Sequence, residues 1–333
     1  MTMHLRYKKI TIKIGSNVLA KADGTLNVSR IAHLVDQLAF LHENGVELVV
    51  VSSGAVAAGR AVLQPSKKTD AVSQRQLWAA LGQVKLISRY SDFFNEHGLV
   101  CAQVLTTKEN FSSRGHYLNM QNCFTTLLEN KVIPIVNEND TISVNELMFT
   151  DNDELSGLIA SMVNSDALIL LSNVDGVYDA NPKSENAKLI RQIEVNNKEP
   201  ENAISVERSD FGRGGMLTKF RIAKKVARDG IGVHVANGTS ENVLIDLLEI
   251  GKDLKHTFFV PNKKSSSGVK KWIGYSDGFA KGQVVVNRGA INALHSDQAV
   301  SLLPVGIVCV DSEFKKGDLI KIVDESGEIV KEK

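Results

Sequence analysis

The sequence predicts an α/β fold: a three-layer α/β/α sandwich with a mostly parallel central sheet, followed by a small β-rich domain. Short, almost continuously apolar segments alternate with segments whose apolar residues recur at helical spacing. Strands of this kind are covered by helices on both faces of a parallel sheet. Beyond residue 258 the helical periodicity stops and only short strand-like pieces follow. A length of 333 residues leaves room for this second domain.

The predicted strands and helices of the first domain follow one another regularly. The first strand is KKITIKIG (8–15), which is rich in β-branched residues and ends at a glycine. A helix is expected over 28–45, where apolar residues recur at helical intervals and a glycine can cap the end. The segment 46–60 is predicted to be a strand that runs into a second helix. Further strands, separated by helical patterns, are predicted over 99–107, 131–140, 166–176 and 231–238.

The last part of the chain differs from the first in composition and in hydrophobic periodicity. Residues 259–268 are polar and contain Pro and Gly, which predicts a linker between a first domain over 1–258 and a second over 269–333. In the second domain the pieces KKWIGY, GQVVVNRGAINAL, VSLLPVGIVCV and GDLIKIVD are expected to be strands.

Composition excludes several classes of protein. With 39 Lys and Arg against 38 Asp and Glu, the chain lacks the basic footprint of a dedicated nucleic-acid binder. Three widely spaced cysteines predict neither a disulfide framework nor a zinc site, and they suit a reducing compartment. No leader pattern and no run of about 18 apolar residues is present. We therefore expect a cytoplasmic protein with no membrane partner, for which nucleic acid is an unlikely ligand.

Polar residues gather at the ends of three predicted strands. They lie at 52–54, at 137–140 and at Ser172 and Asn173. Because ligands bind beyond the carboxyl ends of parallel strands, these clusters should converge on one crevice. Helix capping and turn formation explain any one cluster equally well, since Ser, Asn and Asp are the usual residues for both. Their repetition at several strand ends favours a site.

The segment 136–160 holds an unusual number of carboxylates and amides. A calcium loop would need oxygen ligands at alternate positions, a central Gly and a closing Glu. Counted from Asp151, the fifth position is Leu155, so the pattern fails. No protein metal ligands are predicted.

Two lysines beside glycines are candidates for binding phosphate. Neither GxxxxGK[ST] nor GxGxxG occurs in the sequence. Lys13 and Gly15 end the first strand, where backbone N–H groups and an ammonium can hold an anion at the next helix. Lys219 follows the glycine-rich segment 211–215 in the first turns of another predicted helix. A solvent-exposed helix lysine is the alternative for Lys219 alone.

Six segments in order resemble the motifs of the glutamate 5-kinase family, a branch of the amino-acid kinase family. They are KIGSNVL, VSSGAVAAGR, VNEND, FTDNDELSGLIA, LLSNVDGVYDANP and GRGGMLTK. Each is weak alone, but the ordered set extends from the first strand to about Gly238. The tail resembles a PUA domain through KKWIGY, VSLLPVGI and GDLIKI. It ends at GEIVKEK, so we expect a shortened PUA-like domain behind an amino-acid kinase domain.

The resemblance implies phosphorylation of the γ-carboxylate of L-glutamate by MgATP, the first step of proline biosynthesis. By the same resemblance, Ser53, Asp140 and Asn152 would hold glutamate, with Asp140 facing its ammonium group. Lys13 and Lys219 would flank the transferring phosphoryl group. Asp153 would lie between these two lysines, fix their positions and complete the catalytic set.

The resemblance also assigns a nucleotide site and partners. The expected ATP-binding residues are Lys13, Gly15, Ser172, Asn173, Gly214, Gly215, Met216 and Lys219. Feedback inhibition by L-proline and a homodimer or homotetramer are further expectations. Ser172 and Asn173 stand where the family more often has Thr-Asp, and Arg213 and Leu217 where it often has Thr and Ser.

The chemistry is consistent with this reading. A glutamate side chain has a reference pKa of ~4.3 and is already an anionic nucleophile at neutral pH, so no general base is needed. The barrier is the repulsion between two anions, which lysines, backbone N–H groups and Mg²⁺ reduce. Magnesium depends largely on substrate phosphates and water, which agrees with the missing carboxylate cage.

Two other functions remain open at this level. Another amino-acid kinase, such as an acetylglutamate, aspartate or uridylate kinase, would share the fold and the lysines. A non-catalytic RNA-binding protein would bind in a strongly salt-dependent manner, and the near-neutral charge argues against it.

Overall fold

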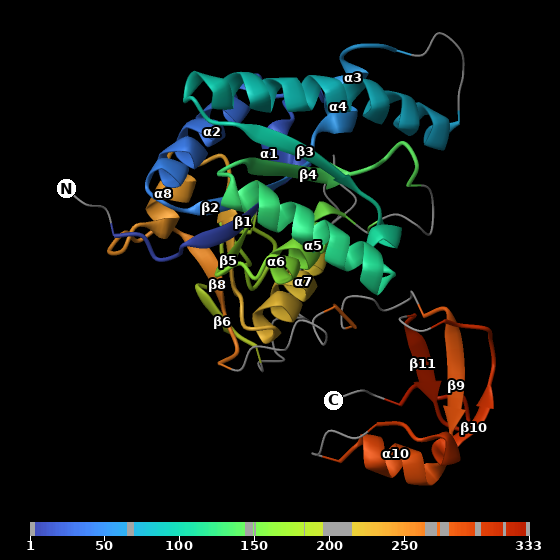
Figure 1. Cartoon of the computed structure of the whole chain (residues 1–333). Coiled ribbons are helices and arrows are strands. Elements are labelled where there is room, and N and C mark those ends of the chain that lie inside the picture. The colour runs from blue at the N-terminus through green and yellow to red at the C-terminus, as the bar shows by residue number, and fades with distance from the viewer. Residues whose placement is uncertain are drawn as a thin grey trace. The chain divides into compact units, whose positions relative to one another are not determined.

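The computed structural model describes residues 4–64, 70–143, 149, 151–182, 184–195, 215–263, 272–273, 280–296, 301–315 and 318–330. Two compact units are present. The first comprises Met1–Lys108 and Gln121–Lys271, and the second Glu109–Met120 and Trp272–Lys333. Figure 1 colours the chain from blue at the N-terminus to red at the C-terminus.

The first unit is built on an eight-stranded sheet with the order β3-β4-β2-β1-β5-β7-β8-β6. Neighbouring strands are parallel except for the antiparallel pair β7 and β8. The strands are β1 Lys9–Ile14, β2 Glu47–Ser52, β3 Cys101–Thr106, β4 Ile133–Glu138, β5 Ala167–Ser172, β6 Gln192–Glu194, β7 Gly232–Asn237 and β8 His256–Val260.

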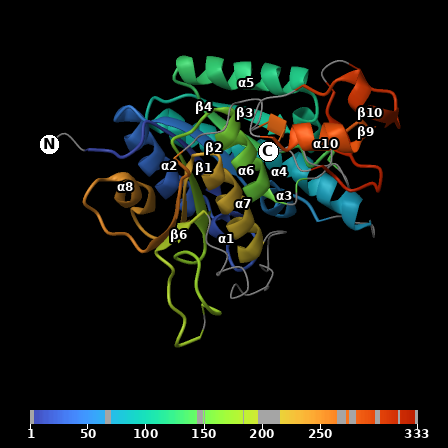
Figure 2. The ribbon, with the colours of Figure 1, turned by 90° about the horizontal axis from the view of Figure 1, so that it is seen from below.

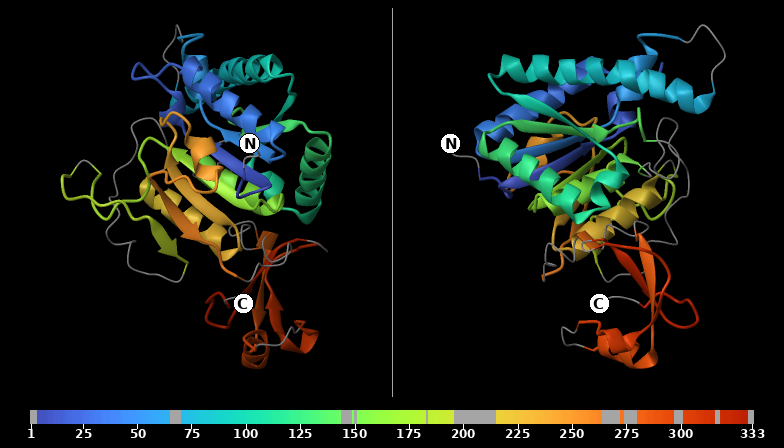
Figure 3. Two further views of the ribbon diagram at one scale, coloured as in Figure 1. Left: turned by 90° about the vertical axis from the view of Figure 1, so that its left-hand side faces the viewer. Right: turned by 45° about the vertical axis from the view of Figure 1, so that its right-hand side comes forward.

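Helices cover both faces of this sheet, as the turned views show (Figures 2 and 3). One layer contains α1, α2, α3, α4 and α8, and the other α5, α6 and α7. Their bounds are α1 Ser16–Leu19, α2 Val28–Glu43, α3 Ala55–Arg60, α4 Ala71–Glu96, α5 Arg114–Glu129, α6 Asn152–Met162, α7 Met216–Arg228 and α8 Val243–Leu248. Every helix in the described part of the chain is too short or too polar to cross a membrane.

Strand alternation in β1 decides which residue faces which layer. Ile10, Ile12 and Ile14 pack into the core formed with α2 and α4. Because successive side chains of a strand point to opposite faces, Thr11 and Lys13 point toward the α6 layer. Most of β1 is apolar and buried, so a lysine within it needs an anionic partner on that side.

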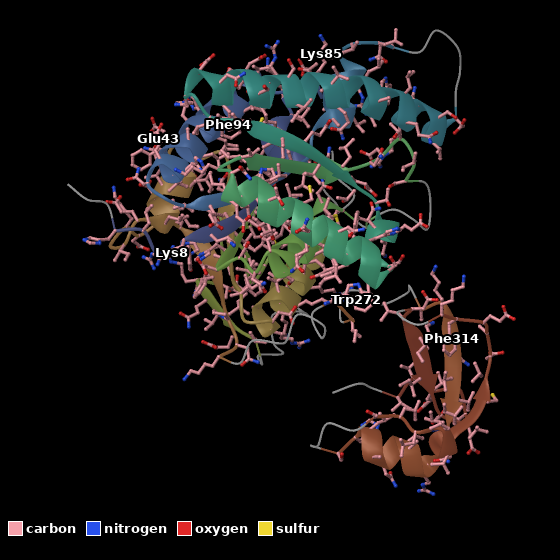
Figure 4. The ribbon with its side chains drawn as sticks, in the orientation of Figure 1. Lys8, Glu43, Lys85, Phe94, Trp272 and Phe314 are labelled. Atoms are coloured by element: carbon pink, nitrogen blue, oxygen red, sulfur yellow. The ribbon has the colours of Figure 1, made fainter. Side chains whose placement is uncertain are left out.

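Helices α3 and α4 approach each other unusually closely. A Cβ added at Gly82 would lie 1.7 Å from the Ala55 carbonyl oxygen, and one at Gly59 would lie 1.8 Å from the Trp78 carbonyl oxygen. Glycine at these two positions therefore lets the two backbones touch. Figure 4 shows the two faces of α4, with Lys85 exposed on its outside and Phe94 buried in the core.

The second unit has its own three-stranded sheet, in the order β10-β9-β11. It comprises β9 Gly282–Val286, α10 Arg288–Leu294, a 3₁₀ turn Pro304–Gly306, β10 Ile307–Val310 and β11 Ile320–Val323. Val284, Val286 and Val330 form its small core. Trp272, labelled in Figure 4, is buried and donates a hydrogen bond of 2.8 Å from Nε1 to the Phe111 carbonyl oxygen of the same unit.

The predicted fold class is confirmed: a large, mostly parallel sheet between helical layers and a small β-rich unit with a separate sheet. Three local predictions were wrong. The second half of GQVVVNRGAINAL is the helix α10 rather than a strand, and Trp272 and Ile273 of KKWIGY are helical. Residues 259 and 260 belong to β8, although their sequence predicted the start of a linker. The domain limits 1–258, 259–268 and 269–333 stay a prediction.

Candidate active site

A buried aspartate lies between two lysines at the carboxyl edge of the sheet. Asp153 Oδ1 is 2.6 Å from Lys13 Nζ, and Asp153 Oδ2 is 2.8 Å from Lys219 Nζ. The Asp153 side chain is fully buried, while those of Lys13 and Lys219 are 6% and 12% exposed. We call these three residues the lysine clamp. They come from three separate elements, β1, α6 and α7.

Local structure explains how α6 and α7 position the side chains of the clamp. Asp151 caps α6, with its Oδ1 accepting hydrogen bonds from the backbone N–H groups of Asp153 and Glu154. This cap places Asp153 in the first turn of α6, beneath β1. Gly215 precedes α7 and accepts the Lys219 backbone N–H through its carbonyl oxygen at 3.2 Å. Both helices therefore begin at the clamp and direct their positive dipole ends toward it.

The three charges shift one another's pKa values. Burial favours the neutral acid of Asp153, but the ammonium groups of Lys13 and Lys219 outweigh it and hold the pKa of Asp153 well below its usual range. Burial lowers the pKa of Lys13, a shift that Asp153 opposes. For Lys219, burial acts in the same lowering direction, yet Asp153 and Asp151 overcome it and raise its pKa. The clamp thus carries two cations on one anion, a net positive charge.

Beside the clamp, hydroxyl, amide and carboxylate groups form a polar cradle, consisting of Ser53, Asn137, Asp140 and Asn152. The Asn152 side-chain nitrogen lies 3.0 Å from Ser53 Oγ and 2.9 Å from Asn137 Oδ1. Gly54, whose φ of +106° suits glycine, turns the chain from β2 into α3 directly after Ser53. The cradle therefore joins the ends of β2 and β4 to the start of α6.

Asp140 of the cradle has a partner that sequence reasoning missed. Arg75 donates to Asp140 Oδ1 from Nε at 3.2 Å and from Nη2 at 2.6 Å. The two residues lie 65 positions apart in the chain, and nothing in the local pattern around Arg75 distinguishes it from a surface arginine of α4. A neighbouring link holds the same elements together, because Gln76 Nε2 donates to the Thr141 carbonyl oxygen at 2.8 Å.

The other carboxylates of this segment have separate roles. Glu138 Oε1 accepts the Phe149 backbone N–H at 2.9 Å, and burial raises the Glu138 pKa to about 7. Glu154 lies 3.7 Å from Lys108. Burial, followed by the nearby Asp153 charge, raises the Asp151 pKa to about 6. Each carboxylate thus has its own local environment, and no group of three or more metal-ligating side chains occurs among the described residues.

The residues expected to bind ATP lie partly within the described chain. Gly15 is buried at the end of β1, where an added Cβ would be 3.2 Å from the Leu171 carbonyl oxygen and 3.4 Å from Lys13 Nζ. Ser172 ends β5 on the adjacent strand and is buried, whereas Asn173 is exposed. Met216 follows Gly215 as the first residue of α7. The remaining two loop positions, Gly214 and Arg213, lie outside the described residues.

Asp175 and Asn237 were not predicted as site residues. The Asn237 side chain donates to Asp175 Oδ1 at 3.0 Å, and Asn237 ends the strand that pairs with β5. Their polar pair borders the same edge as Ser172. The sequence offered a signal for them, because both follow apolar strands as the chosen clusters do.

Two buried lysines beside two helix starts at the carboxyl edge of the sheet suit the binding and transfer of a phosphoryl group, and comparison with known proteins agrees. Residues 8–237 match the model of the amino acid kinase family, and residues 282–330 match that of the PUA domain. A glutamate 5-kinase of Bacteroides thetaiotaomicron is 56% identical over 98% of this chain and 90% of its own length. The chain therefore belongs to the amino acid kinase family and, within it, to the glutamate 5-kinases.

Further similarities support the same placement. A glutamate 5-kinase of Chlorobaculum tepidum is 47% identical over 98% of this chain and 90% of its own length. Among solved structures, the UMP kinase of Bacillus anthracis covers 77% of this chain and 97% of its own, with a TM-score of 0.52 and 18% identity. An isopentenyl phosphate kinase of T. acidophilum covers 75% and 99%, with a TM-score of 0.53 and 19% identity. These structural matches show the fold alone.

Proposed function

We propose that this protein transfers the γ-phosphoryl group of ATP to the γ-carboxylate of L-glutamate and forms L-glutamyl 5-phosphate, the first step of proline biosynthesis. The observation that carries the proposal is the lysine clamp beside a polar cradle at one edge of the sheet. The close relation to glutamate 5-kinases selects glutamate over the substrates of other family members.

The cradle supplies the groups that an amino-acid substrate needs. Asp140 is an anion suited to the substrate ammonium, and Ser53 and Asn152 provide hydroxyl and amide contacts. The Asn152 nitrogen already has more acceptors around it than its two hydrogens can serve, at 2.9, 3.0 and 3.3 Å. A substrate oxygen can therefore replace one of these partners without leaving a buried donor unpaired.

The clamp acts on the group in transfer. The substrate γ-carboxylate attacks the γ-phosphorus, the bond from that phosphorus to the β–γ bridging oxygen breaks, and ADP leaves with the electron pair. Negative charge grows along the line of attack and departure, where Lys13 and Lys219 stabilise it. Asp153 does not touch the reacting atoms; it positions both ammonium groups so that their mutual repulsion does not separate them.

The proposed nucleotide site comprises Gly15, Ser172, Asn173, Gly215 and Met216, together with Gly214. Backbone N–H groups at the starts of α1 and α7 suit phosphate oxygens. Two cations dominate the clamp, and the described residues offer no group of three or more metal-ligating side chains. This arrangement fits a Mg²⁺ ion that is held mainly by the phosphates of the nucleotide and by water. When bound, that ion would neutralise phosphate charge. Asp151 Oδ2, a buried oxygen with no hydrogen-bond partner among the described residues, is available to one of its waters.

Three further properties belong to the proposal. Feedback inhibition by L-proline and assembly into a homodimer or homotetramer rest on membership of the glutamate 5-kinases alone. A cytoplasmic location is supported by the three free cysteines, which suit a reducing compartment.

The test is a trapping assay on the purified full chain. ATP, Mg²⁺ and L-glutamate are supplied with hydroxylamine, which converts an acyl phosphate into a hydroxamate. Parallel reactions contain aspartate, N-acetylglutamate or UMP, and ADP release is measured in each. We expect hydroxamate from L-glutamate alone. ADP release with UMP, or hydroxamate from N-acetylglutamate or aspartate at a higher rate, would assign a different substrate within the family.

A further inference from the structure

Arg75 uses only part of its hydrogen-bonding capacity on Asp140. Its Nε and Nη2 atoms both donate to Asp140 Oδ1, at 3.2 and 2.6 Å. A guanidinium carries five N–H donors, and in the described part of the chain no other acceptor is paired with Arg75. The Arg75 side chain is 32% exposed, so its remaining donors are accessible to a ligand.

Asp140 is likewise only half used. Oδ1 takes both contacts from Arg75, while Oδ2 makes no hydrogen bond to any residue that the structure describes. The Asp140 side chain is 7% exposed, so water reaches it poorly. A nearly buried carboxylate with one open oxygen is suited to a second cation, and that cation can bind without displacing Arg75.

The pair is held firmly in place from both sides. Asp70 caps α4 by accepting the backbone N–H groups of Val72 and Ser73, which fixes the turn that carries Arg75. The link from Gln76 to the Thr141 carbonyl oxygen ties the same turn to the residue after Asp140. The pair therefore has the rigid backbone support expected of a binding site rather than of a mobile surface contact.

An α-amino acid presents one ammonium and one carboxylate on the same carbon. An aspartate with an open oxygen beside an arginine with open donors is complementary to that pair of charges. We propose that Arg75 is a substrate-binding residue that holds the α-carboxylate of the amino acid, while Asp140 holds its ammonium. The inference rests on the proposed function and specifies that the α-carboxylate and the ammonium of the substrate are both recognised. A substrate with a blocked amino group would leave the Asp140 charge without its second partner.

Substrate analogues that each lack one charge test this assignment. 4-Aminobutyrate is glutamate without the α-carboxylate, and glutarate is glutamate without the ammonium. The variant Arg75→Gln is compared with Arg89→Gln, because Arg89 lies on the same helix, is 51% exposed and is remote from the cradle in sequence. Hydroxamate formation gives kcat and KM for each compound, and calorimetry without nucleotide gives binding. Thermal unfolding shows whether each variant is folded.

For the unaltered protein we expect 4-aminobutyrate to have a kcat/KM about 10- to 100-fold below that of glutamate, since a hydrogen bond to a charged group contributes about 1.5–3 kcal/mol. Arg75→Gln should lower kcat/KM for glutamate by the same factor, through KM, and leave 4-aminobutyrate unchanged. Arg75→Lys, which keeps the charge, should restore part of the loss. Arg89→Gln should behave as the unaltered protein.

Two results would overturn the inference. Equal losses on glutamate and 4-aminobutyrate would mean that Arg75 only supports Asp140, and tighter glutamate binding in Arg75→Gln would mean that Arg75 competes with the ammonium. The proposed function fails separately, if the unaltered protein binds glutamate but makes no hydroxamate. Calorimetry of the same compounds still decides the role of Arg75 in that case.

Discussion

Two buried carboxylates at one edge of the sheet have opposite ionisation behaviour. Asp153 is fully buried, yet two ammonium groups hold its pKa well below the usual range. Glu138, at the end of β4, is also buried, and there burial raises the pKa to about 7; the Asp140 charge adds to the rise, and Arg75, which pairs with Asp140, opposes it only in part. Burial alone favours the neutral acid at both positions. The pKa values of the two carboxylates differ because neighbouring elements place two cations against Asp153, whereas at Glu138 the effect of burial outweighs that of the nearby Arg75.

The same contrast distinguishes the clamp from the cradle. Asp153 already holds both lysines of the clamp in place, so the clamp geometry exists before any substrate arrives and costs no reorganisation during the reaction. The cradle and its neighbour Arg75 leave groups that a ligand can use: Asp140 Oδ2 has no hydrogen-bond partner among the described residues, and Arg75 has unused N–H donors. Substitutions in the clamp should therefore change turnover, and substitutions in the cradle should change binding.

The sharpest test of the contrast removes the clamp's anion. Asp153→Asn leaves two buried ammonium groups without their shared partner. We expect kcat to fall at least about 10³-fold, since both phosphoryl contacts lose their position. The free energy of unfolding should also fall by about 3–5 kcal/mol, as when one partner of a buried ion pair is removed. Steady-state hydroxamate assays and urea unfolding measure these effects.

The matched control for that substitution is Asp92→Asn, which removes a carboxylate that is 54% exposed. It should change neither quantity appreciably. Asp153→Asn with normal turnover would show that the lysines hold their positions without a central anion.

Removal of one lysine should affect turnover alone. Lys219→Ala is expected to lower kcat about 10²- to 10³-fold, because one donor to the developing charge is lost. Binding of L-glutamate, measured by calorimetry without nucleotide, should be unchanged, since the proposed partner of Lys219 is the phosphoryl group. Arg228→Ala, at the exposed end of the same helix, serves as control. Unchanged turnover in Lys219→Ala would show that Lys219 does not act on the phosphoryl group.

A third substitution tests whether the cradle depends on the contact between α3 and α4. In Gly82→Ala the new Cβ would lie 1.7 Å from the Ala55 carbonyl oxygen, so the helices must separate. We expect a loss of about 1–3 kcal/mol in unfolding free energy. Glutamate KM should rise more than kcat falls, because α3 begins two residues after Ser53.

Gly115→Ala is the control for that substitution, because a Cβ there meets nothing within 4 Å and the residue is also helical. It should leave KM and stability close to those of the unaltered protein. A raised KM in both variants would show that the rise in KM does not depend on the α3–α4 contact.

The smallest expected effect concerns Glu138 and pH. Its folded pKa of about 7 lies above its ordinary value of 4.5, so the stability linked to its protonated form is present below pH 4.5 and is lost as pH rises through 7. Glu138→Gln should remove this loss. The gain of the variant over the unaltered protein should grow with pH and approach about 3 kcal/mol above pH 7, since the shift from 4.5 to about 7 is about 2.5 pKa units and one unit is about 1.4 kcal/mol.

Urea unfolding at several pH values measures that difference. Glu129→Gln, at the exposed end of α5, should follow the unaltered protein at every pH. Parallel curves for Glu138→Gln and the unaltered protein would show that Glu138 is ionised in the folded state, like Asp153.

Part of this molecule follows from the sequence because local patterns encode it. Alternating strand and helix periodicities predicted the parallel sheet, and its carboxyl edge predicted where the site lies. The two lysines were predicted from their positions beside glycines at helix starts, and Asp153 from the resemblance of one short segment to a family motif. The edge strand β6 and its neighbour β8 were missed, since β6 has three residues and β8 precedes a polar stretch that resembles a linker.

Tertiary structure alone decided which side chains meet. Lys13, Asp153 and Lys219 come together only because β1, α6 and α7 pack against one another, which brings residues 66 positions apart to 2.8 Å. The pairing of Arg75 with Asp140 across 65 positions has no local signature at all. Periodicity reports which face of an element is buried, whereas the partner of a buried charge depends on how separate elements pack. The sequence by itself therefore determined the fold class and the edge that carries the candidate site, and the packing determined the charge pairs within it.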